Sequence, residues 1–502
     1  MNKDRPPPLL DDGELERLYR QRIAAQTLAY CDAEIAMAFV DDVAGLASPE
    51  RGEALRRNFI DFLKRATSTE NVWKSLHGLL KMVDGAEREK LISNHNIRAA
   101  AGAFAHFAAR VNGRNGGGLR IVFVAQTPYF TILRQAIHLR RNGHRVYLVS
   151  VEPLKRSMRA LFEDSFDACT DSRGDYPLFR YLLGLLEPNI FHVQCWMLDY
   201  FFGRLVIDNK RKAAAVCELY DITSLCGGRD DLCTGWPADR VDLDLAMERY
   251  IATKADAVLT RYPRPVHQEL RRRYGGNADI LEFCPYPCPE FMHYGSGTSP
   301  KDGEGVRLVF AGGVCPSKAS DSKNMFPHHN MTDIIRLLVE QGLRVDVLHD
   351  PNRPVHPRAP DLEEYYRLEE SLPGFRFLDG FPPDRTAEAL SAYDFGIILY
   401  DINVGKLKSK PGRFEWGVGT KLFTYLEAGL PIIVNSEYEY MAEFVERNGL
   451  GFAVSTAEID TVADRIAALD YEGVAANVRR YNEDHGMQKE IGRLIELYEG
   501  LV

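Results

Sequence analysis

The amino-acid sequence predicts an α/β protein with two Rossmann-like domains that face a cleft, preceded by an all-helical N-terminal extension. The chain has 502 residues, more than the roughly 250 to 300 at which a single core stops growing, so it should form several folding units. From Leu119 onward, short apolar strands alternate with helices, which is typical of parallel sheets covered by helices. Residues 13–111 show only helical periodicity.

The helical N-terminal domain is expected over residues 1–112. In ELERLYRQRIAAQTLAYCDAEIAMAFV, apolar residues recur three and four positions apart, as on the buried face of a helix. The segment NGRNGGG at residues 112–118 then interrupts every regular pattern, as glycine-rich segments between domains do. The first domain boundary is therefore expected in this segment.

The two α/β domains are expected over residues 119–284 and 306–484. The strands of the first are LRIVFVA, RVYLVSV, NIFHVQC, AAAVCEL, DAVLT and DILEF. Those of the second are VRLVFAG, LRVDVLH, FRFLD, FGIILY, PIIVN and GFAV. Residues 285–305, rich in Pro, Gly and Ser, form the linker. Ligands of open parallel sheets bind beyond the carboxyl ends of the strands, so the two domains should enclose a substrate between them.

Composition restricts the function and the location. There are 62 Lys and Arg against 71 Asp and Glu, a formal net charge of -9, which argues against nucleic acid as partner and favours a small-molecule substrate. No run approaches the ~18 apolar residues of a membrane span, and the N-terminus has no apolar signal segment after its charges. The nine cysteines are interpreted as reduced thiols. A cytoplasmic location is expected.

The densest motif is GTKLFTYLEAGLPIIVN at residues 419–435. A helix is expected to start at Thr420 and end at Gly429, with a strand opened by Pro431. The amides of its first turn, with Thr420 as cap and Lys421 beside it, would form a site for an anion such as a diphosphate. Thr424 lies one turn further along the same face.

This motif resembles a segment of the retaining glycosyltransferases of family four, P-N-K-L-x-E-Y-L-A-A-G-x-P-V-V, whose fold is called GT-B. The resemblance extends over about residues 119–502. VRLVFAGGVCPSK resembles the phosphate-binding opening of the family's second domain, and HVQCW is similar to its HxHxW-type strand end. RRYNEDHG and LIELYEGL resemble its closing helix, so residues of about 485–502 are expected to pack back on the first domain.

The resemblance implies a hexosyltransferase-like enzyme that moves a sugar from a nucleotide diphosphate sugar to an acceptor hydroxyl with retention, in glycan or glycoconjugate synthesis. It implies neither a metal nor a cofactor beyond the nucleotide sugar. The expected donor- and phosphate-binding residues are Gly312, Gly313, Lys318, Lys323, Gly419, Thr420, Lys421 and Thr424. Two of them depart from the family: Thr424 stands where a Glu binds the donor ribose, and Gly313 stands where an Arg binds the diphosphate. Lys318 or Lys323 would then supply that charge.

The first domain is expected to contribute the acceptor side and the catalytic groups. Gln126, Tyr129 and Gln194 are the acceptor-side candidates, because each can hydrogen-bond a sugar. His192 ends a strand on the side expected to face the cleft, and Asp221 follows the next strand, so both are catalytic candidates. For each an ordinary structural role stays open, a hydrogen-bonded core position for His192 and a turn cap for Asp221.

A second hypothesis is a non-catalytic scaffold of the same fold that binds a nucleotide sugar or a glycan. The departures at Thr424 and Gly313 favour it, as does the loop QTPYF at residues 126–130, which replaces the Gly-Gly turn of the family. The acceptor is left open between a glycan, a small molecule and a lipid. A protein partner of the helical N-terminal domain is also left open.

Two further hypotheses carry less weight. The residues Arg134, Arg140, Arg141 and Arg145 could touch an anionic inner membrane, although the acidic total favours an ordinary solvated helix face. Asp242 and Asp244 form a D-x-D, and Cys284 and Cys288 have a zinc-compatible gap. Helix-start acids are common for dipole reasons and the other cysteines are too widely spaced, so no metal site is assigned.

Overall fold

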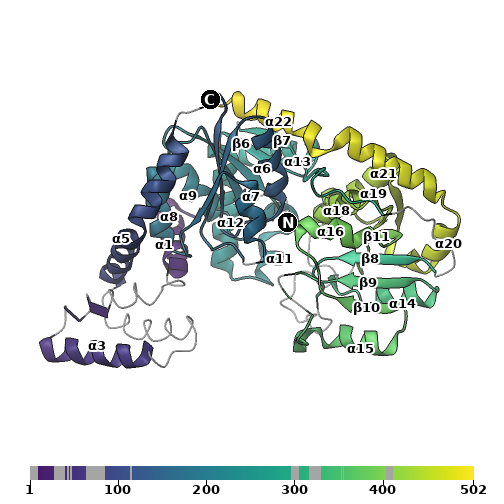
Figure 1. The fold of residues 1–502 in the computed structure, drawn as a ribbon, viewed down its shortest axis with the longest axis horizontal. Helices are drawn as coiled ribbons and strands as arrows, with labels where there is room; N and C mark the ends of the chain where they lie inside the picture. Colours follow the sequence, from purple (N-terminus) through teal and green to yellow (C-terminus); the bar gives the residue numbers. More distant parts are fainter. Residues whose placement is uncertain are drawn as a thin grey trace.

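The computed structural model describes residues 10–27, 40–41, 44–45, 48–63, 85–113, 116–155, 157–276, 278–295, 305–315, 329–351, 353, 355–402 and 411–502. The first α/β domain is built on a parallel sheet of seven strands in the order β3-β2-β1-β4-β5-β6-β7 (Figure 1). Its strands are β1 (Arg120–Ala125), β2 (Arg145–Ser150), β3 (Ala168–Asp171), β4 (Ile190–Cys195), β5 (Ala214–Leu219), β6 (Ala257–Thr260) and β7 (Asp279–Glu282). The six strands predicted for this domain are confirmed, and the edge strand β3 is additional.

The second α/β domain contains a parallel sheet of six strands in the order β10-β9-β8-β11-β12-β13. Its strands are β8 (Arg307–Ala311), β9 (Arg344–Leu348), β10 (Phe375–Leu378), β11 (Phe395–Ile398), β12 (Ile432–Asn435) and β13 (Gly451–Val454). All six were predicted. In both sheets the strand order reverses beside the first strand, at β1/β4 and at β8/β11, which is where open α/β sheets bind ligands.

Helices cover both sheets. Those of the first domain are α6 (Thr131–Arg141), α7 (Arg159–Ser165), α8 (Tyr176–Leu185), α9 (Phe201–Asn209), α10 (Thr223–Cys226), α11 (Arg229–Cys233), α12 (Ala238–Lys254) and α13 (Arg264–Tyr274). Those of the second are α14 (Thr332–Glu340), α15 (Glu363–Ser371), α16 (Pro383–Leu390), α17 (Pro411–Trp416), α18 (Thr420–Glu427), α19 (Glu439–Arg447) and α20 (Val462–Ala467). Two short 3-10 turns, Pro360–Leu362 and Thr456–Thr461, accompany the second set.

The N-terminal region contains α1 (Asp12–Thr27), α3 (Pro49–Leu63) and α5 (Gly85–Asn112), and two of these helices share the core of the first α/β domain. α5 packs on α8, and α1 packs on α8 and α12, while α3 extends away from the body (Figure 1). Phe107 and Val111 of α5 belong to the same buried cluster as Val122 and Val124 of β1. The glycine-rich segment after α5 therefore does not separate two independent cores.

The first sheet has two apolar faces with different neighbours. Val122 and Val124 face the cluster that contains α1, α5, α8 and α9. Ile121 and Phe123 face a second cluster, which continues into the core of the second α/β domain. Buried side chains of the interdomain segment, such as Phe291, join this second cluster. The first part of the predicted linker is thus packed between the domains.

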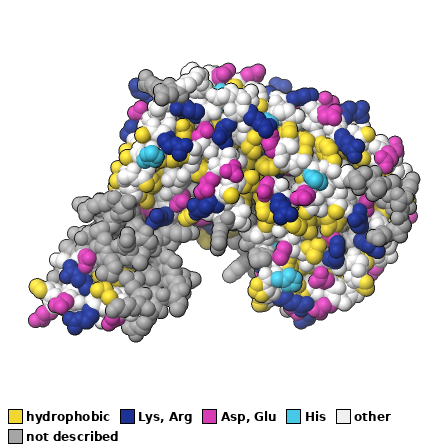
Figure 2. Space-filling model, in the orientation of Figure 1, with side chains coloured by type: hydrophobic (Ala, Val, Ile, Leu, Met, Phe, Trp, Pro, Cys, Tyr) yellow, Lys and Arg dark blue, Asp and Glu magenta, His cyan; other side chains and the backbone are white. Residues whose placement is uncertain are grey.

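The last two helices return the chain to the first domain. α21 (Tyr471–His485) and α22 (Met487–Glu499) run across both domains, drawn in yellow in Figure 1. α22 packs on α6, and the Tyr498 hydroxyl contacts the His192 ring on β4. Within the described part of the chain, no helix combines the length and apolarity needed to cross a membrane. On the face shown in Figure 2, acidic and basic side chains are interspersed.

The shared core makes α5 a determinant of stability. The Phe107 side chain is 5% exposed and meets the Tyr147 ring edge-on, with the ring centroids 6.1 Å apart. Replacing a buried phenylalanine by alanine leaves a cavity, so Phe107→Ala is expected to lower the free energy of unfolding by about 3 to 5 kcal/mol in urea denaturation. Ile60→Ala on α3 is the matched control, because Ile60 is 39% exposed and should change stability by less than about 0.5 kcal/mol. Equal effects of the two substitutions would contradict the shared core.

Candidate functional site

A cavity of about 510 Å³ lies where the carboxyl ends of the two sheets meet. The first domain contributes the loop after β1 and residues after β2 and β4, and the second contributes the turns after β8 and β9 and the start of α18. Of the residues predicted from the sequence, the cavity is lined by Gln126, Tyr129, Gly312, Gly313, Thr420, Lys421 and Thr424. Lys318 and Lys323 lie outside the described residues.

The N-terminus of α18 points its first amides at this cavity. Gly419 is the N-cap residue, with extended backbone, and Thr420 is the first helical residue. The prediction that Thr420 caps the helix is therefore wrong, because the chain turns into the helix one residue earlier. No side chain caps this end among the described residues, which leaves the amides at the start of the helix available to an anion.

The Thr420 side chain instead lies close to the Tyr129 hydroxyl, which comes from the loop after β1 in the other domain. Burial raises the pKa of the Tyr129 hydroxyl, while the nearby Thr420 and Lys421 side chains lower it. Tyr129 is therefore a neutral donor or acceptor at the cavity wall. Thr424, one turn further along, also lines the cavity, and its hydroxyl lies 3.4 Å from the Thr420 carbonyl oxygen.

Lys421 carries a positive charge over a glycine turn. Its ammonium group lies 5.0 Å from the centroid of the Phe310 ring, and its stem crosses Gly312. Gly312 has a φ of 141°, and a Cβ added there would lie 2.5 Å from Lys421 Cε, so only glycine fits. Burial lowers the pKa of Lys421. No carboxylate among the described residues forms an ion pair with it, so this cation is available to a ligand.

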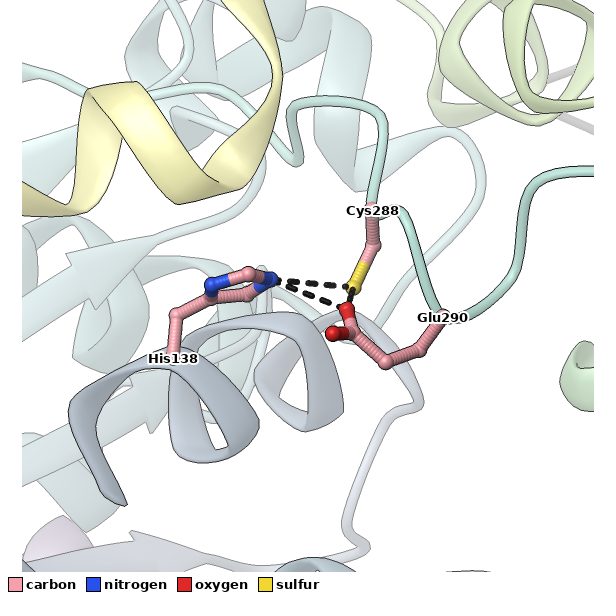
Figure 3. Close-up of side chains that lie close together, drawn as sticks. All are labelled: His138, Cys288 and Glu290. Atoms are coloured by element: carbon pink, nitrogen blue, oxygen red, sulfur yellow. Dashed lines mark hydrogen bonds and ion pairs between the residues drawn. The ribbon is translucent and has the colours of Figure 1, made fainter. Parts of the chain in front are cut away.

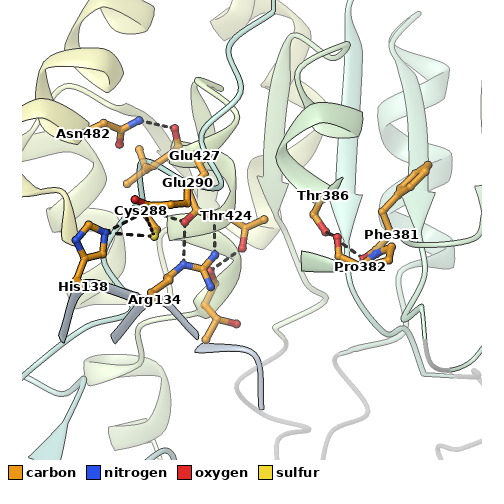
Figure 4. A network of polar contacts seen from close by, with 12 residues as sticks. Arg134, His138, Cys288, Glu290, Phe381, Pro382, Thr386, Thr424, Glu427 and Asn482 are labelled. Atoms are coloured by element: carbon orange, nitrogen blue, oxygen red, sulfur yellow. Dashed lines mark hydrogen bonds and ion pairs between the residues drawn. The ribbon is translucent and has the colours of Figure 1, made fainter. Parts of the chain in front are cut away.

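A buried ion pair between Arg134 and Glu427 was not predicted. Arg134 of α6 donates through Nε and Nη2 to both carboxylate oxygens of Glu427 at the end of α18, at 2.8 and 2.5 Å (Figure 4). The two side chains are only 2% and 1% exposed. The interpretation of Arg134 as a solvated or membrane-facing residue is therefore wrong, because the second domain covers this face of α6.

Arg134 also forms part of the cavity wall, and one of its nitrogens is unused. Its Nη1 is buried and has no hydrogen-bond partner among the described residues. Burial by itself would lower the pKa of Arg134, but the Glu427 carboxylate outweighs it and raises that pKa. The guanidinium is thus a fixed positive charge held by the second domain. Arg134 and Glu427 lie 293 positions apart in the sequence, so only the tertiary structure brings them together.

The acceptor-side candidates divide into two roles. Gln126 and Tyr129 line the cavity, whereas Gln194 lies beneath the loop after β1. The Gln194 side chain accepts a hydrogen bond from the Tyr129 amide at 3.0 Å and donates to Thr131 Oγ1 at 3.4 Å. It supports the loop and does not reach the cavity. The Tyr129 ring packs edge-on against Trp196, with centroids 5.0 Å apart, which makes one cavity wall aromatic.

The two catalytic candidates do not line this cavity. His192 is fully buried, and its ring nitrogens contact the Tyr498 hydroxyl and Glu218 Oε2, the latter at 3.1 Å. The prediction that it faces the cleft is wrong, because that side of β4 is covered by α22. Asp221 accepts a hydrogen bond from Arg261 at 2.8 Å and is absent from the cavity wall. Both side chains hold the first domain together.

The D-x-D acids also have structural partners. Asp244 accepts hydrogen bonds from the amides of Leu198 and Tyr200 at 2.8 and 2.9 Å. Asp242 forms a two-point ion pair with Arg229. Burial raises the pKa of Asp244 to about 7. These partners explain both acids without a metal ion.

The Arg134–Glu427 pair yields a stability test. Glu427→Gln leaves the Arg134 charge buried without a counter-charge, so we expect the free energy of unfolding to fall by about 3 to 5 kcal/mol in urea denaturation. Glu443→Gln on α19 is the matched control, because its ion pair with Arg447 at 3.3 Å is exposed and should contribute less than about 1 kcal/mol. A Glu427→Gln protein as stable as the control variant would contradict the buried pair.

Comparison with known proteins agrees with this architecture. Residues 361–486 match the model of the family described as "glucosyltransferase 3-like, C-terminal domain". No curated protein matches the sequence. A sucrose-phosphate synthase from Thermosynechococcus elongatus shares 11% identity and a TM-score of 0.50, over 76% of this chain and all of that one.

Two other solved structures are similar at lower scores. A calicheamicin glycosyltransferase has 13% identity and a TM-score of 0.40, over 76% of this chain and 98% of that one. A UDP-GlcNAc 2-epimerase from Neisseria meningitidis, solved with UDP-GlcNAc bound, has 10% identity and a TM-score of 0.43, over 75% of this chain and 98% of that one. At these identities a likeness concerns the fold alone. With its two facing parallel sheets, the chain has the GT-B fold, and its C-terminal domain is similar to that of glucosyltransferases.

Proposed function

We propose that this protein is a glycosyltransferase that takes a sugar from a nucleotide diphosphate sugar and transfers it to an acceptor hydroxyl with retention of configuration. The observation that carries the proposal is the positive cavity wall at the start of α18. Uncapped helix amides and the Lys421 ammonium group meet there, with no ion-pair partner for Lys421 among the described residues. A diphosphate has the charge and the acceptor oxygens that such a wall binds.

In the proposed reaction these groups stabilise the departing nucleoside diphosphate. Negative charge grows on the leaving phosphate as the bond to the sugar breaks, so fixed donors aimed at that oxygen lower the barrier. Lys421 and the amides of Thr420 and Lys421 lie on the second-domain side of the cavity, and Arg134 lies on the first-domain side. With His192 and Asp221 engaged elsewhere, we propose that the donor phosphate itself accepts the acceptor proton, without a metal ion.

The aromatic wall would receive the acceptor. Tyr129, Phe130 and Trp196 line the cavity from the first domain, and Gln126 adds a polar group. Aromatic faces with a few polar groups at their edge suit a sugar or another ring with hydroxyl substituents. We propose that the acceptor hydroxyl approaches the donor from this side.

The second candidate is a non-catalytic protein that binds a nucleotide sugar in the same cavity. Thr424 supports it, because a single hydroxyl replaces a carboxylate that could hold both ribose hydroxyls. Titration calorimetry with UDP, GDP and their common sugar conjugates, followed by donor hydrolysis assays, separates the candidates. Binding with slow hydrolysis supports the transferase, binding without turnover on any acceptor supports the scaffold, and no binding overturns both.

Lys421 provides the most direct test of the anion site. Lys421→Ala is expected to weaken binding of the nucleoside diphosphate by about 1.5 to 3 kcal/mol, through loss of a charge-assisted hydrogen bond, with little change in the melting temperature. Lys489→Ala on α22 is the matched control. The Lys489 side chain is exposed, and its Nζ forms a surface ion pair with Asp484 Oδ1 at 3.5 Å, away from the cavity. Unchanged affinity in Lys421→Ala would remove the proposed site.

The same lysine predicts a pH dependence. Lys421 binds as a cation, and its pKa is lowered by burial, so affinity should begin to fall at a lower pH than the ordinary lysine value of about 10.4 would give. Calorimetry between neutral pH and about pH 10 measures this decline. Lys421→Arg keeps its charge over that range and is expected to abolish the decline. If affinity still declines with rising pH in Lys421→Arg, the decline is caused by the titration of another group.

The contribution of Arg134 to donor binding can be measured separately from its contribution to stability. Replacing Arg134 and Glu427 together by Met removes both buried charges, so the double variant should be more stable than either single variant. Its donor affinity is nevertheless expected to stay about tenfold or more below that of the natural protein, because the guanidinium nitrogen at the cavity is gone. Calorimetry on the folded double variant measures this, and natural affinity would restrict Arg134 to a structural role.

A further inference from the structure

Three potential metal-ligating side chains meet where the interdomain segment crosses α6. They are His138 of α6 and Cys288 and Glu290 of the segment that leaves the first domain (Figure 3). The His138 Nε2 atom lies 2.9 Å from Glu290 Oε2 and 3.6 Å from Cys288 Sγ, and Sγ lies 2.8 Å from Oε2. The three atoms thus form a compact triangle, from residues up to 152 positions apart.

These atoms form a donor set that suits zinc. Imidazole nitrogen, thiolate sulfur and carboxylate oxygen are its usual ligands, whereas magnesium and calcium prefer oxygen alone. Zinc bonds of about 2.0 to 2.3 Å at tetrahedral angles place ligand atoms about 3.4 to 3.6 Å apart. The His138–Cys288 distance already has this value. Glu290, whose side chain is 19% exposed, would need to move outward by less than about 1 Å.

Zinc binds cysteine as the thiolate, so the Cys288 thiol must give up its proton when a metal binds. Binding of one Zn²⁺ therefore releases one proton from Cys288 to solvent and forms the zinc–sulfur bond.

The surroundings supply an orienting group and an entry path. Arg141, also on α6, contacts the other carboxylate oxygen of Glu290, Oε1, which leaves Oε2 to face His138 and Cys288. Such a contact fixes a ligating carboxylate from outside the metal. Glu290 and Arg141 also line a surface pocket with Asp164 and Asp167, separate from the cavity between the sheets. A hydrated cation could enter through this pocket.

A metal ion here would act on the contact between the domains. The amide of Cys288 donates a hydrogen bond to Glu427 Oε1 at 2.9 Å, and Glu427 holds Arg134 at the cavity wall (Figure 4). His138 lies one turn after Arg134 on α6. A metal between His138 and Cys288 would therefore hold the interdomain segment against the helix that carries Arg134.

We propose that His138, Cys288 and Glu290 bind one zinc ion, with water as fourth ligand, and that this structural ion stabilises the contact between the two α/β domains. The proposal does not depend on sugar transfer, and the ion lies outside the cavity in which the donor is placed. It links α6 to the interdomain segment by coordination bonds, beside the Arg134–Glu427 ion pair, which links α6 to α18.

The first test measures the metal directly. The full chain, purified without chelator from a zinc-supplemented culture, is expected to contain about one zinc per chain by mass spectrometry of the dissolved metal. Cys288→Ser and His138→Gln are expected to lose it. Cys284→Ser is the matched control, because Cys284 is a buried thiol just before the same segment and donates a hydrogen bond to the Arg261 carbonyl oxygen, away from the three side chains. Zinc at the same level in Cys288→Ser and Cys284→Ser would overturn the site.

The second test needs no variant and covers the case in which the substitutions prevent folding. After removal of metal by chelation, titration with Co²⁺ is expected to produce a thiolate-to-cobalt charge-transfer band and the visible absorption of tetrahedral cobalt. Added Zn²⁺ should abolish both and raise the melting temperature. If zinc-supplemented protein holds less than about a tenth of an equivalent of zinc and cobalt gives no thiolate band, the three side chains form only a hydrogen-bonded cluster.

Discussion

The arrangement of the two α/β domains depends on a buried ion pair between Arg134 and Glu427. Removing both charges from water is costly, and the pair offsets this only because both carboxylate oxygens are engaged and the Cys288 amide adds a third hydrogen bond. The contact has a defined geometry, since a two-point bond between a guanidinium and a carboxylate tolerates little rotation. It sets how the carboxyl ends of the two sheets face each other, and hence the shape of the cavity.

The cavity combines the charge of one domain with the aromatic surface of the other. The chain as a whole is acidic, with a net charge of -9, yet the start of α18, Lys421 and Arg134 bring positive groups to this interior surface, beside the carboxylates of Asp199 and Asp350. Partial burial strengthens such charges because little water screens them. Net charge therefore describes the protein as a whole, but it says little about a cleft that only a few side chains line. Tyr129 of the first domain and Thr420 of the second lie close together in the wall of this cleft.

The positions of His192 and Gln194 explain why neither side chain lines the cavity, although His192 was predicted to be catalytic and Gln194 to bind the acceptor. Both lie on β4, and side chains two residues apart point to the same face of a strand. In a parallel sheet both faces are covered by helices, so only residues beyond the carboxyl end of a strand reach the cleft. Trp196, the residue after β4, lines the cavity, whereas His192 contacts Tyr498 of α22 and Gln194 supports the loop after β1. The strand was predicted with its observed end at Cys195, but His192 lies inside it and so does not reach the cleft.

The sequence by itself determined the strands of both α/β domains other than β3 and the helix that begins at Thr420, because apolar periodicity and the turn residues around Gly419 and Gly429 act over a few neighbouring positions. It missed β3, a four-residue edge strand whose residues are only partly buried and carry a weak apolar pattern. Only the tertiary structure decided the partners of Arg134, which was expected on a solvated or membrane-facing helix, and of His138, for which the sequence made no prediction; both lie at the domain contact. Those partners are Glu427 and the pair Cys288 and Glu290, more than a hundred residues away. Local periodicity records which face of a helix is buried, but not which distant side chain will cover it.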